Sequence, residues 1–381
     1  MRISRINGRK NNRYIFTLIA ALSTSVAALA LFGGCSVTPI FATIETEIPL
    51  ATPTVLGKIS ELFWANPSAS ARELYLTNGK LKRKTATSNS WADVPLPAST
   101  TALRVTSIAT DTLDGNGSLY ALFVNESDWT VFNSIQRFDG SAWTPVTGIP
   151  EGTSIGKIGS GNGRIYAFVK TGSSGSKLIY SVSTVTGTVY DAASLATLQP
   201  SGNVDLPASS GDYVVSSDTV FHWDGSGLTT LTGTGNTGTY ISVTTDVSGN
   251  PYVLSTSGVY VSNDAGTTWT SHGYSVSSPV QSISVLDQTS ATATDFILVS
   301  GLTGYCEITG TVGGTWAASS QVPGISATSS ISTSANAQYT SSLALYCVDR
   351  IFGVTNHTPS GDTYVIYASV RNDTFDGLWG Y

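Results

Sequence analysis

A turn followed by an apolar anchor residue recurs along this chain of 381 residues, and that repeat limits the fold more than any other feature. The anchors stand a mean of 48 residues apart over six intervals, at Trp91, Trp143, Tyr190, Leu228, Trp269, Trp316 and Trp379. Periods between roughly 20 and 50 residues indicate folds that stack several copies of one supersecondary unit. The sequence therefore predicts one large repeat structure.

The segments before several anchors predict that the repeated unit consists of β-strands. An alternating segment at Val105–Ala109 is followed by an aromatic-rich segment at Leu119–Phe123. The aromatic-rich type returns at Arg164–Phe168, Pro251–Leu254, Phe296–Val299 and Tyr364–Tyr367. Period-two alternation is the pattern of half-buried strands. Composition agrees, because Gly, Ser and Thr are abundant and only 12% of the residues are charged, so runs that favour helices are scarce.

Four-stranded repeats of this length are typical of the blades of a β-propeller. We expect an all-β fold with a single propeller over residues 43–381, built from seven blades of four antiparallel strands. Six blades is the alternative, because the region 200–235 is short and the region 325–381 is long. A ring must also close, since an open strand edge invites aggregation. Thr43–Ile48 alternates like a strand and could complete the last blade beside Gly377–Tyr381.

One turn carries a family resemblance. Residues Ser262–Trp269 match the Asp-box, or bacterial neuraminidase repeat, S-x-D-x-G-x-[ST]-W in full, and weaker relatives stand at 138–143, 223–228 and 313–316. In that family the box is a hairpin between the third and fourth strands of a blade. The resemblance implies a structural role for five residues: Ser262, Asp264, Gly266, Thr268 and Trp269. Asp264 would accept hydrogen bonds in the turn, Gly266 would supply the turn dihedral angle and Trp269 would pack between blades.

The catalytic set of Asp-box sialidases is not recognisable in this sequence. Those enzymes resemble one another in an Arg followed by Ile-Pro, and none of the arginines here is followed by that pair. The nearest approach, Arg164-Ile165-Tyr166, fits a strand better. A structural role therefore suits Arg164, and no catalytic residue is predicted.

Metal binding finds little support in the sequence. His222, His272 and His357 are isolated from one another, and no metal-binding His spacing occurs. The stretch Asp111–Ser118 resembles part of a calcium loop, but Asn125 stands where a closing acid would be needed. We predict a polar hairpin turn there, with weak calcium binding as the alternative, and no other metal and no cofactor for the chain.

The first residues resemble the signal of a bacterial lipoprotein. A basic stretch with five Arg and Lys residues precedes the apolar stretch Tyr14–Phe32, which is the pattern of a secretory signal. Gly34 and Cys35 then resemble the end of a lipobox, and Phe32 in place of Leu resembles the relaxed lipoboxes of spirochaetes. The resemblance implies a signal peptide over 1–34, lipid on Cys35 and a tether over 35–42. An uncleaved signal anchor is the alternative, because 19 apolar residues can just span a bilayer.

The net charge limits which partners the chain can bind, and the cysteines indicate a possible disulfide. The signal holds five of the 19 Lys and Arg residues and none of the 25 acids, so the mature chain carries a net charge near −11. Nucleic acid is therefore not an expected partner. Cys306 and Cys347 remain after Cys35. They could form a disulfide in the cell envelope, and two buried thiols are the alternative.

These observations predict a monomeric, noncatalytic propeller that is lipid-anchored in the bacterial envelope and binds an envelope or host macromolecule, either protein or glycan. The expected location is the outer membrane, on its periplasmic or surface face. A glycan-processing enzyme with an unrecognised site and an outer-membrane assembly factor are the alternatives. Four aromatic residues could line a binding face, although most propeller aromatics pack between blades: Trp64, Trp129, Tyr274 and Trp379.

Overall fold

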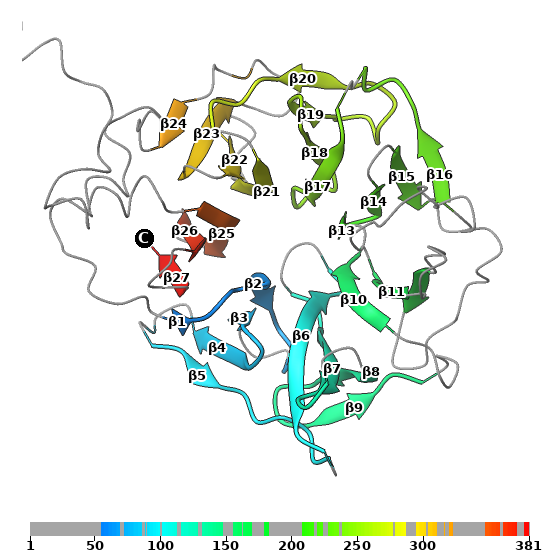
Figure 1. The fold of residues 1–381 in the computed structure, drawn as a ribbon, viewed down its shortest axis with the longest axis vertical. Helices are drawn as coiled ribbons and strands as arrows, with labels where there is room; N and C mark the ends of the chain where they lie inside the picture. Colours follow the sequence, from blue (N-terminus) through cyan, green and yellow to red (C-terminus); the bar gives the residue numbers. More distant parts are fainter. Residues whose placement is uncertain are drawn as a thin grey trace, which may run out of the picture.

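The structure is a computed structural model. It describes residues 55–68, 72–85, 88, 90–99, 101–112, 116–128, 132–147, 155–161, 163–169, 179–182, 208–216, 219–223, 228–235, 238–276, 279–286, 295–301, 304–310, 316, 320–322, 347–358, 361–371 and 377–380. Within these ranges every regular element is a strand, and 27 strands form seven antiparallel sheets around one axis (Figure 1). No helix long and apolar enough to cross a membrane occurs in them.

Three sheets come from the first half of the described chain and take their strands in chain order from the axis outward (Figure 1). The first contains β2 (Glu61–Ala65), β3 (Glu73–Thr77), β4 (Leu81–Thr85) and β5 (Ala92–Asp93). The second contains β6 (Leu103–Thr110), β7 (Leu119–Asn125), β8 (Phe132–Phe138) and β9 (Trp143–Pro145). The third has three described strands: β10 (Ile155–Ser160), β11 (Ile165–Val169) and β12 (Ile179–Val182).

Three more sheets repeat the same order. They contain β13 (Ala208–Ser210), β14 (Tyr213–Ser216), β15 (Thr219–Trp223) and β16 (Leu228–Leu231); β17 (Tyr240–Thr245), β18 (Pro251–Ser255), β19 (Val259–Val261) and β20 (Thr270–His272); and β21 (Val280–Leu286), β22 (Asp295–Gly301), β23 (Gly304–Gly310) and β24 (Ser320–Val322). The aromatic-rich segments predicted from the sequence lie in second strands, as in β7, β18 and β22.

The last sheet closes the ring with strands from both ends of the described chain. It contains β25 (Cys347–Thr358), β26 (Gly361–Arg371), β27 (Gly377–Gly380) and, outermost, β1 (Val55–Leu56). Val55 pairs with Leu378 and Leu56 with Gly377. The expected closure is therefore found, but a later segment than the predicted Thr43–Ile48 provides the strand. Thr43–Ile48 lies outside the described residues.

Each sheet is covered on both faces by its neighbours, which explains why the second strands are apolar throughout. All five residues of β18 are buried, as are the first six of β7. Such continuous apolar runs are expected where both faces of a strand are covered. Side chains from adjacent sheets meet in separate clusters; one of them joins the β6–β9 sheet to the β10–β12 sheet through Ala109, Tyr120, Leu122, Ile135, Ile155, Ile158, Ile165 and Ala167.

The innermost strands are joined by hydroxyl groups. Each of these strands pairs with only one neighbour in its sheet, so its other edge leaves backbone groups without a ladder partner. Serines of adjacent innermost strands accept hydrogen bonds from these N–H groups. The bonds run from Ile158 to Ser107 (3.2 Å), Thr110 to Ser160 (3.1 Å), Thr245 to Ser210 (3.1 Å), Ile351 to Ser282 (2.9 Å) and Gly353 to Ser284 (2.8 Å).

The anchors lie at the boundaries between sheets. Trp91 contacts Tyr367 of the closing sheet edge-on, with ring centroids 6.3 Å apart. The indole N–H of Trp143 donates to the carbonyl of Pro95, which follows the preceding sheet (2.8 Å). Trp316 contacts Tyr252 of the preceding sheet at 6.1 Å. Tyr190 and the side chain of Trp379 lie outside the described residues.

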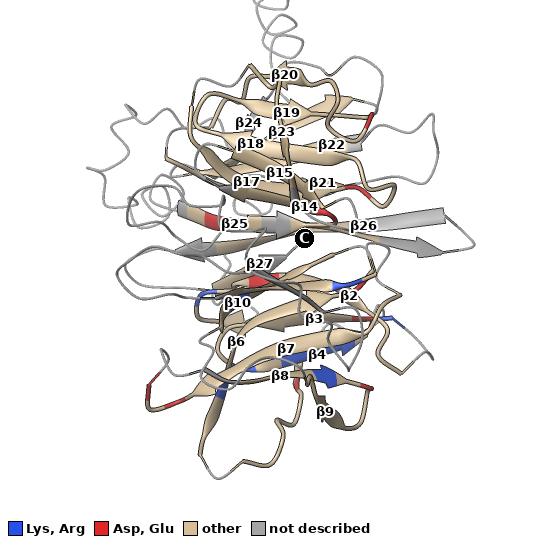
Figure 2. Ribbon diagram, turned by 90° about the vertical axis from the view of Figure 1, so that its right-hand side faces the viewer, with Lys and Arg blue, Asp and Glu red and all other residues tan. Residues whose placement is uncertain are grey.

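Charged side chains are sparse on the strands (Figure 2), and those of β4 are engaged by neighbours. Lys82 pairs with Asp93 at 2.5 Å and Arg83 with Glu73 at 3.2 Å. Lys84 lies over the rings of Trp91 and Tyr367, at 5.4 and 5.2 Å from their centroids. The basic run on β4 therefore stabilises the outer part of its sheet and the boundary with the closing sheet.

Two leucines at the ring closure give a matched test of its contribution to stability. Leu378 of β27 is 0% exposed and packs between the closing and first sheets, whereas Leu56 of β1 is 65% exposed. We expect Leu378→Ala to lower the free energy of unfolding by about 2–5 kcal/mol, because it leaves a cavity. Leu56→Ala should cost less than about 0.5 kcal/mol. Urea denaturation measures both, and equal effects would contradict the closure described above.

Candidate binding site in the central channel

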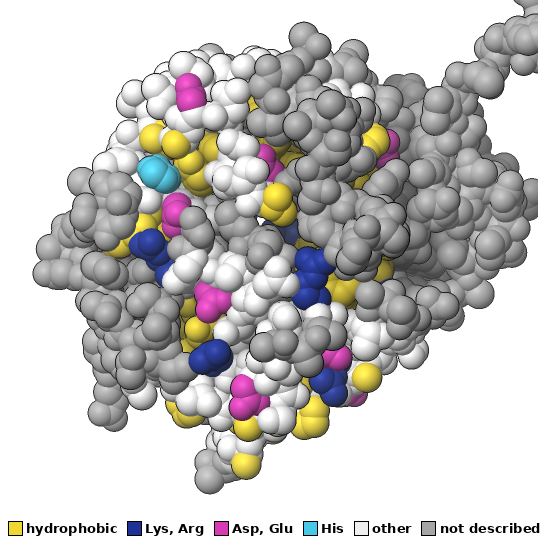
Figure 3. All heavy atoms as spheres, turned by 180° about the vertical axis from the view of Figure 1, so that it is seen from behind, with side chains coloured by type: hydrophobic (Ala, Val, Ile, Leu, Met, Phe, Trp, Pro, Cys, Tyr) yellow, Lys and Arg dark blue, Asp and Glu magenta, His cyan; other side chains and the backbone are white. Residues whose placement is uncertain are grey.

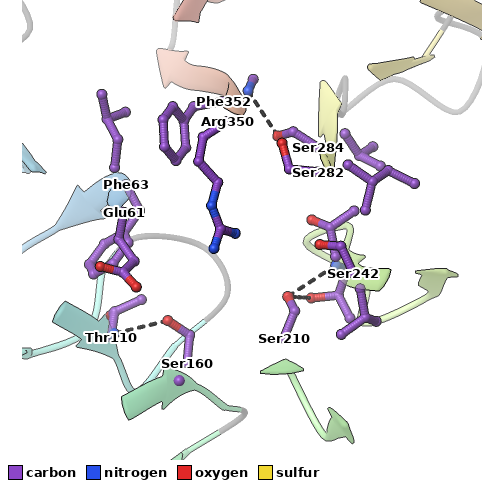
Figure 4. A pocket seen from close by; sticks show the side chains of 18 of the residues that line it. Glu61, Phe63, Thr110, Ser160, Ser210, Ser242, Ser282, Ser284, Arg350 and Phe352 are labelled. Atoms are coloured by element: carbon purple, nitrogen blue, oxygen red, sulfur yellow. Dashed lines mark hydrogen bonds between the residues drawn. The ribbon is translucent and has the colours of Figure 1, made fainter. Parts of the chain in front are cut away.

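The innermost strands surround a cavity of about 290 Å³ on the axis of the ring (Figure 4). All seven described sheets contribute residues to its wall, through β2, β6, β10, β13, β17, β21 and β25. The face seen in Figure 3 is hollowed near its middle, where the axis passes. A concave site of this size is at the low end for small-molecule pockets, so it suits a small ligand or the end group of a larger one.

Hydroxyl groups dominate the polar part of the wall. The hydroxyl-bearing lining residues include Ser60, Thr110, Thr112, Ser160, Ser210, Ser242, Thr244, Thr245, Ser282, Ser284 and Thr355. Ser160, Ser210, Ser282 and Ser284 already accept backbone hydrogen bonds from neighbouring strands. Because a hydroxyl can donate as well as accept, such groups can still offer a hydrogen to a ligand.

Four charged side chains line the cavity. Asp246 follows β17, and the other three are Glu61 from β2, Lys157 from β10 and Arg350 from β25. Arg350 reaches into the middle of the channel, and Glu61 stands on the wall that β2 forms (Figure 4). In the described part of the chain, none of the three forms an ion pair within 4.0 Å. This distinguishes them from the paired cations Lys82 and Arg83 of β4.

The carboxylate of Glu61 is incompletely satisfied. Its Oε1 accepts a hydrogen bond from the hydroxyl of Ser107 at 3.3 Å. Its Oε2 is buried and has no hydrogen-bond partner among the described residues. Burial raises the pKa of Glu61, while Lys157 and Arg350 act in the opposite direction. A buried oxygen without a partner is costly, so this atom is a natural point for a ligand or a water to donate to.

Burial and the nearby charge of Arg350 lower the pKa of Lys157, while Glu61 raises it, and the net result is a pKa of about 8. The two cations therefore repel each other, and Glu61 attracts both of them. Asp246 also lines the cavity, but its oxygens accept from Asn250 (2.8 and 2.7 Å) and hold the turn after β17. Among the described residues, the charges that shift the pKa of Lys157 are those of Arg350 and Glu61.

The Ser262–Trp269 turn lies between β19 and β20, the third and fourth strands of their sheet. Asp264 accepts from the hydroxyls of Ser262 (2.8 Å) and Thr268 (2.6 Å) and from the N–H of Thr268 (2.8 Å). Bonds from Thr268 and then Ser262 lower the pKa of Asp264 to about 2. Gly266 has a φ of 84°, and its carbonyl accepts from the indole of Trp269 (3.0 Å). The turn lies among the outer strands and takes no part in the cavity.

A second turn uses an aspartate in the same way. Asp139, between β8 and β9, accepts from the N–H groups of Ser141 (2.8 Å) and Ala142 (2.6 Å). Gly140 has a φ of 98°. The two turns share an acid that organises its own backbone, which is a structural use of the side chain.

Of the other sequence candidates in the described residues, Thr112 of the Asp111–Ser118 stretch lines the cavity, and the histidines stay apart from it. His222 stacks on Tyr213 at 4.9 Å, and His272 lies 6.0 Å from Trp316. The carboxylate of Asp111 accepts from the N–H of Ser118 at 2.8 Å in the turn between β6 and β7. The side chain of His357 and all of Asp114 lie outside the described residues. Within the described ranges, no three His, Cys, Asp or Glu side chains form a group that could hold a metal ion.

Arg164 lies 3.9 Å from Asp212 and over the ring of Trp223, at 5.5 Å from its centroid. These contacts agree with the structural role that its strand pattern favours. Among the four candidate aromatics, Trp64 lines the cavity. Tyr274 packs between sheets and donates to the carbonyl of Thr256 at 2.7 Å. Trp129 and the side chain of Trp379 lie outside the described part of the chain.

The two cysteines lie in adjacent sheets. Cys306 of β23 is buried in the cluster that faces the β17–β20 sheet. Its neighbour Tyr305 packs toward the closing sheet, which contains Cys347 at the start of β25. Because successive strand residues point to opposite faces, Cys306 points away from the sheet of Cys347. The side chain of Cys347 and all of Cys35 lie outside the described residues, so the pairing stays a prediction for which the orientation of Cys306 is unfavourable.

Sequence analysis did not identify Glu61, Lys157 or Arg350. Each is a charged residue on an innermost strand, and Lys157 is the one charged residue of β10. A charge on a strand with few other charges is the signal that could have revealed them, although β25 also contains Asp349. Their convergence needs the register of three separate sheets, which spacing along the chain does not provide.

Comparison with protein families gives a match over residues 4–381, to the model described as the TP013X lipoprotein family. Among curated proteins, none matches the sequence. The fold is similar to a structure titled "YCF48 bound to D1 peptide", at 14% identity and a TM-score of 0.47, covering 86% of this chain and 93% of that one. It is also similar to "Streptogramin B lyase structure", at 11% identity and a TM-score of 0.49, covering 84% and 92%. Likenesses at these values carry no inference about activity.

A partly buried cation in the channel should make stability depend on pH. Between the lowered pKa of Lys157, about 8, and the ordinary value of 10.5, the unfolded chain binds more protons than the folded one. The contribution of this residue to stability therefore rises with pH across that window. Lys157→Met removes the effect, and we expect it to be more stable than wild type at pH 7 by on the order of 2 kcal/mol, with little advantage left at pH 10.

Urea denaturation at both pH values measures this difference. Lys80→Met, which removes an exposed cation, is the control and should show no such change with pH. A constant difference between wild type and Lys157→Met across the window would contradict the burial of the Lys157 ammonium.

Proposed function

We propose a function for this chain, which belongs to the TP013X lipoprotein family. It is a lipid-anchored β-propeller whose central channel binds part of an envelope or host macromolecule. The family supports a lipid-anchored protein of the bacterial envelope. We propose Cys35 as the lipidated residue, 1–34 as the signal peptide and 35–42 as the tether. We place the propeller at the outer membrane, on its periplasmic or surface face, as a monomer without a cofactor.

The observation that carries this proposal is the set of charges in the channel. Glu61, Lys157 and Arg350 line one cavity without an ion pair among the described residues, and one oxygen of Glu61 has no hydrogen-bond partner there. Partly buried charges cost free energy unless partners satisfy them. Clusters of perturbed titratable groups in a cavity are therefore candidates for a functional site.

The rest of the ring supports a rigid module. The seven sheets of the described residues support a propeller of seven blades, with Tyr190 as the anchor predicted for the three-stranded sheet. We propose that Ser262–Trp269 is an Asp-box, which is supported by its place between third and fourth strands and by the bonds to Asp264. Asp264 and Asp139 organise turns, so we assign them a structural role and propose a noncatalytic binding function.

Two exposed apolar residues allow the binding site to be located in cells. Val247 is 39% exposed and lines the cavity, whereas Leu56 is 65% exposed on the outermost strand of the closing sheet. A photo-crosslinking residue that replaces Val247 in the full-length lipoprotein should give a reproducible adduct on irradiation of intact cells. The same residue at Leu56 should not give that adduct, because it lies away from the channel.

Mass spectrometry of the adduct identifies the partner as protein or glycan. Equal yields from the two positions would contradict a channel-centred site, and so would the absence of an adduct from Val247. Release of a processed glycan by the wild-type protein would instead favour the enzymatic alternative.

A further inference from the structure

The channel side of two neighbouring innermost strands carries the same short pattern. On β2, Glu61 is followed two residues later by Phe63, and on β25, Arg350 is followed two residues later by Phe352. All four line the cavity. Residues i and i+2 of a strand share a face, so each strand offers a charge and then an aromatic ring to the channel. Figure 4 shows these four side chains on adjoining parts of the wall.

Two cations of the cavity wall, on β25 and β10, influence the same acid on β2. Arg350 and Lys157 both act on Glu61, and Arg350 lowers the pKa of Lys157. While Lys157 is protonated, Arg350, Lys157 and Glu61 together carry one positive charge in excess. The second acid of the wall, Asp246, accepts hydrogen bonds from Asn250. The chain as a whole is acidic, with 25 Asp and Glu residues against 19 Lys and Arg. A local positive charge in an acidic protein favours a ligand with a single negative charge over a polyanion.

We infer that the channel holds the carboxylate of its ligand between Arg350 and Lys157, with an apolar part of the ligand against Phe63 and Phe352. This inference rests on the proposed use of the channel as the binding site. A guanidinium binds a carboxylate through two parallel hydrogen bonds, which gives both affinity and orientation. Glu61 limits the total charge that the site accepts, so a phosphate with nearly two negative charges is disfavoured. The neighbouring hydroxyls of Ser282 and Ser284 add donors to the wall.

Benzoate and benzamide are suitable probes, because they have nearly the same shape and differ in charge. Ligand-observed NMR titration of the purified lipoprotein should give a dissociation constant for benzoate at least about 10-fold lower than that for benzamide, a difference of about 1.4 kcal/mol. Inorganic phosphate should bind more weakly than benzoate. Equal binding of benzoate and benzamide, or tighter binding of phosphate, would overturn the carboxylate assignment.

Two variants test the residues named. Arg350→Gln should bring benzoate down to the affinity of benzamide, whereas Lys80→Gln, which removes an exposed cation, should leave the ratio unchanged. Phe352→Leu should weaken both probes by a similar factor, because it alters the apolar contact and keeps the charges. If Arg350→Gln fails to fold, Phe352→Leu and the three probes on the wild-type protein still test whether the channel binds a carboxylate. Equal losses from Arg350→Gln and Lys80→Gln would contradict the inference.

The outcomes separate this inference from the proposed function. If Val247 gives its adduct in cells and benzoate does not bind, the channel remains the site and the carboxylate assignment is wrong. If benzoate binds in the channel and Val247 gives no adduct, the carboxylate site stands and the macromolecular ligand is wrong.

Discussion

The hydrogen bonds between innermost strands are the interaction on which the rest of this structure depends. A ring of sheets brings the inner edge of every sheet to one axis, where backbone N–H groups would otherwise lack partners. Hydroxyls of Ser107, Ser160, Ser210, Ser282 and Ser284 accept these bonds across the boundaries between sheets. At these boundaries the hydroxyls satisfy N–H groups of the inner edges without covering them, and a channel remains open along the axis.

The hydrogen bonds between innermost strands also determine which polar groups of the channel wall can bind a ligand. Several hydroxyls of the channel wall, those of Ser160, Ser210, Ser282 and Ser284, accept backbone hydrogen bonds and so hold neighbouring sheets together. Glu61, Lys157 and Arg350 are different, because they line the cavity without an ion pair among the described residues. The cations on the outer strand β4 have partners or lie over aromatic rings. The cations of β4 thus stabilise the outer part of the fold, whereas Lys157 and Arg350 line the channel.

The sequence allowed much of the fold to be predicted, because its repeated features are local. Alternation and aromatic runs predicted strands such as β7 and β18, and the Ser262–Trp269 motif predicted a turn in which Asp264 accepts hydrogen bonds. The closing strand was harder to locate. Thr43–Ile48 has the better alternation, but Val55 pairs with Leu378 because partners in the ring, not local pattern, decide which segment fills the last edge.

The candidate site could not be predicted for a related reason. Glu61, Lys157 and Arg350 are far apart in the chain, and they meet only because the register of β2, β10 and β25 turns each of them toward the axis. A one-residue change of register would move any of them to the opposite face of its strand. Sequence periodicity identifies a strand, but it does not show which side of the strand points toward the channel. That depends on how neighbouring sheets pack.

The crystal structure of the mature protein grown with benzoate would test the central claim most directly. The account predicts density for the carboxylate within hydrogen-bonding distance of the Arg350 guanidinium, with the aromatic ring against Phe352. A channel that contains only water, with benzoate bound elsewhere or absent, would contradict the claim that these charges form the ligand site.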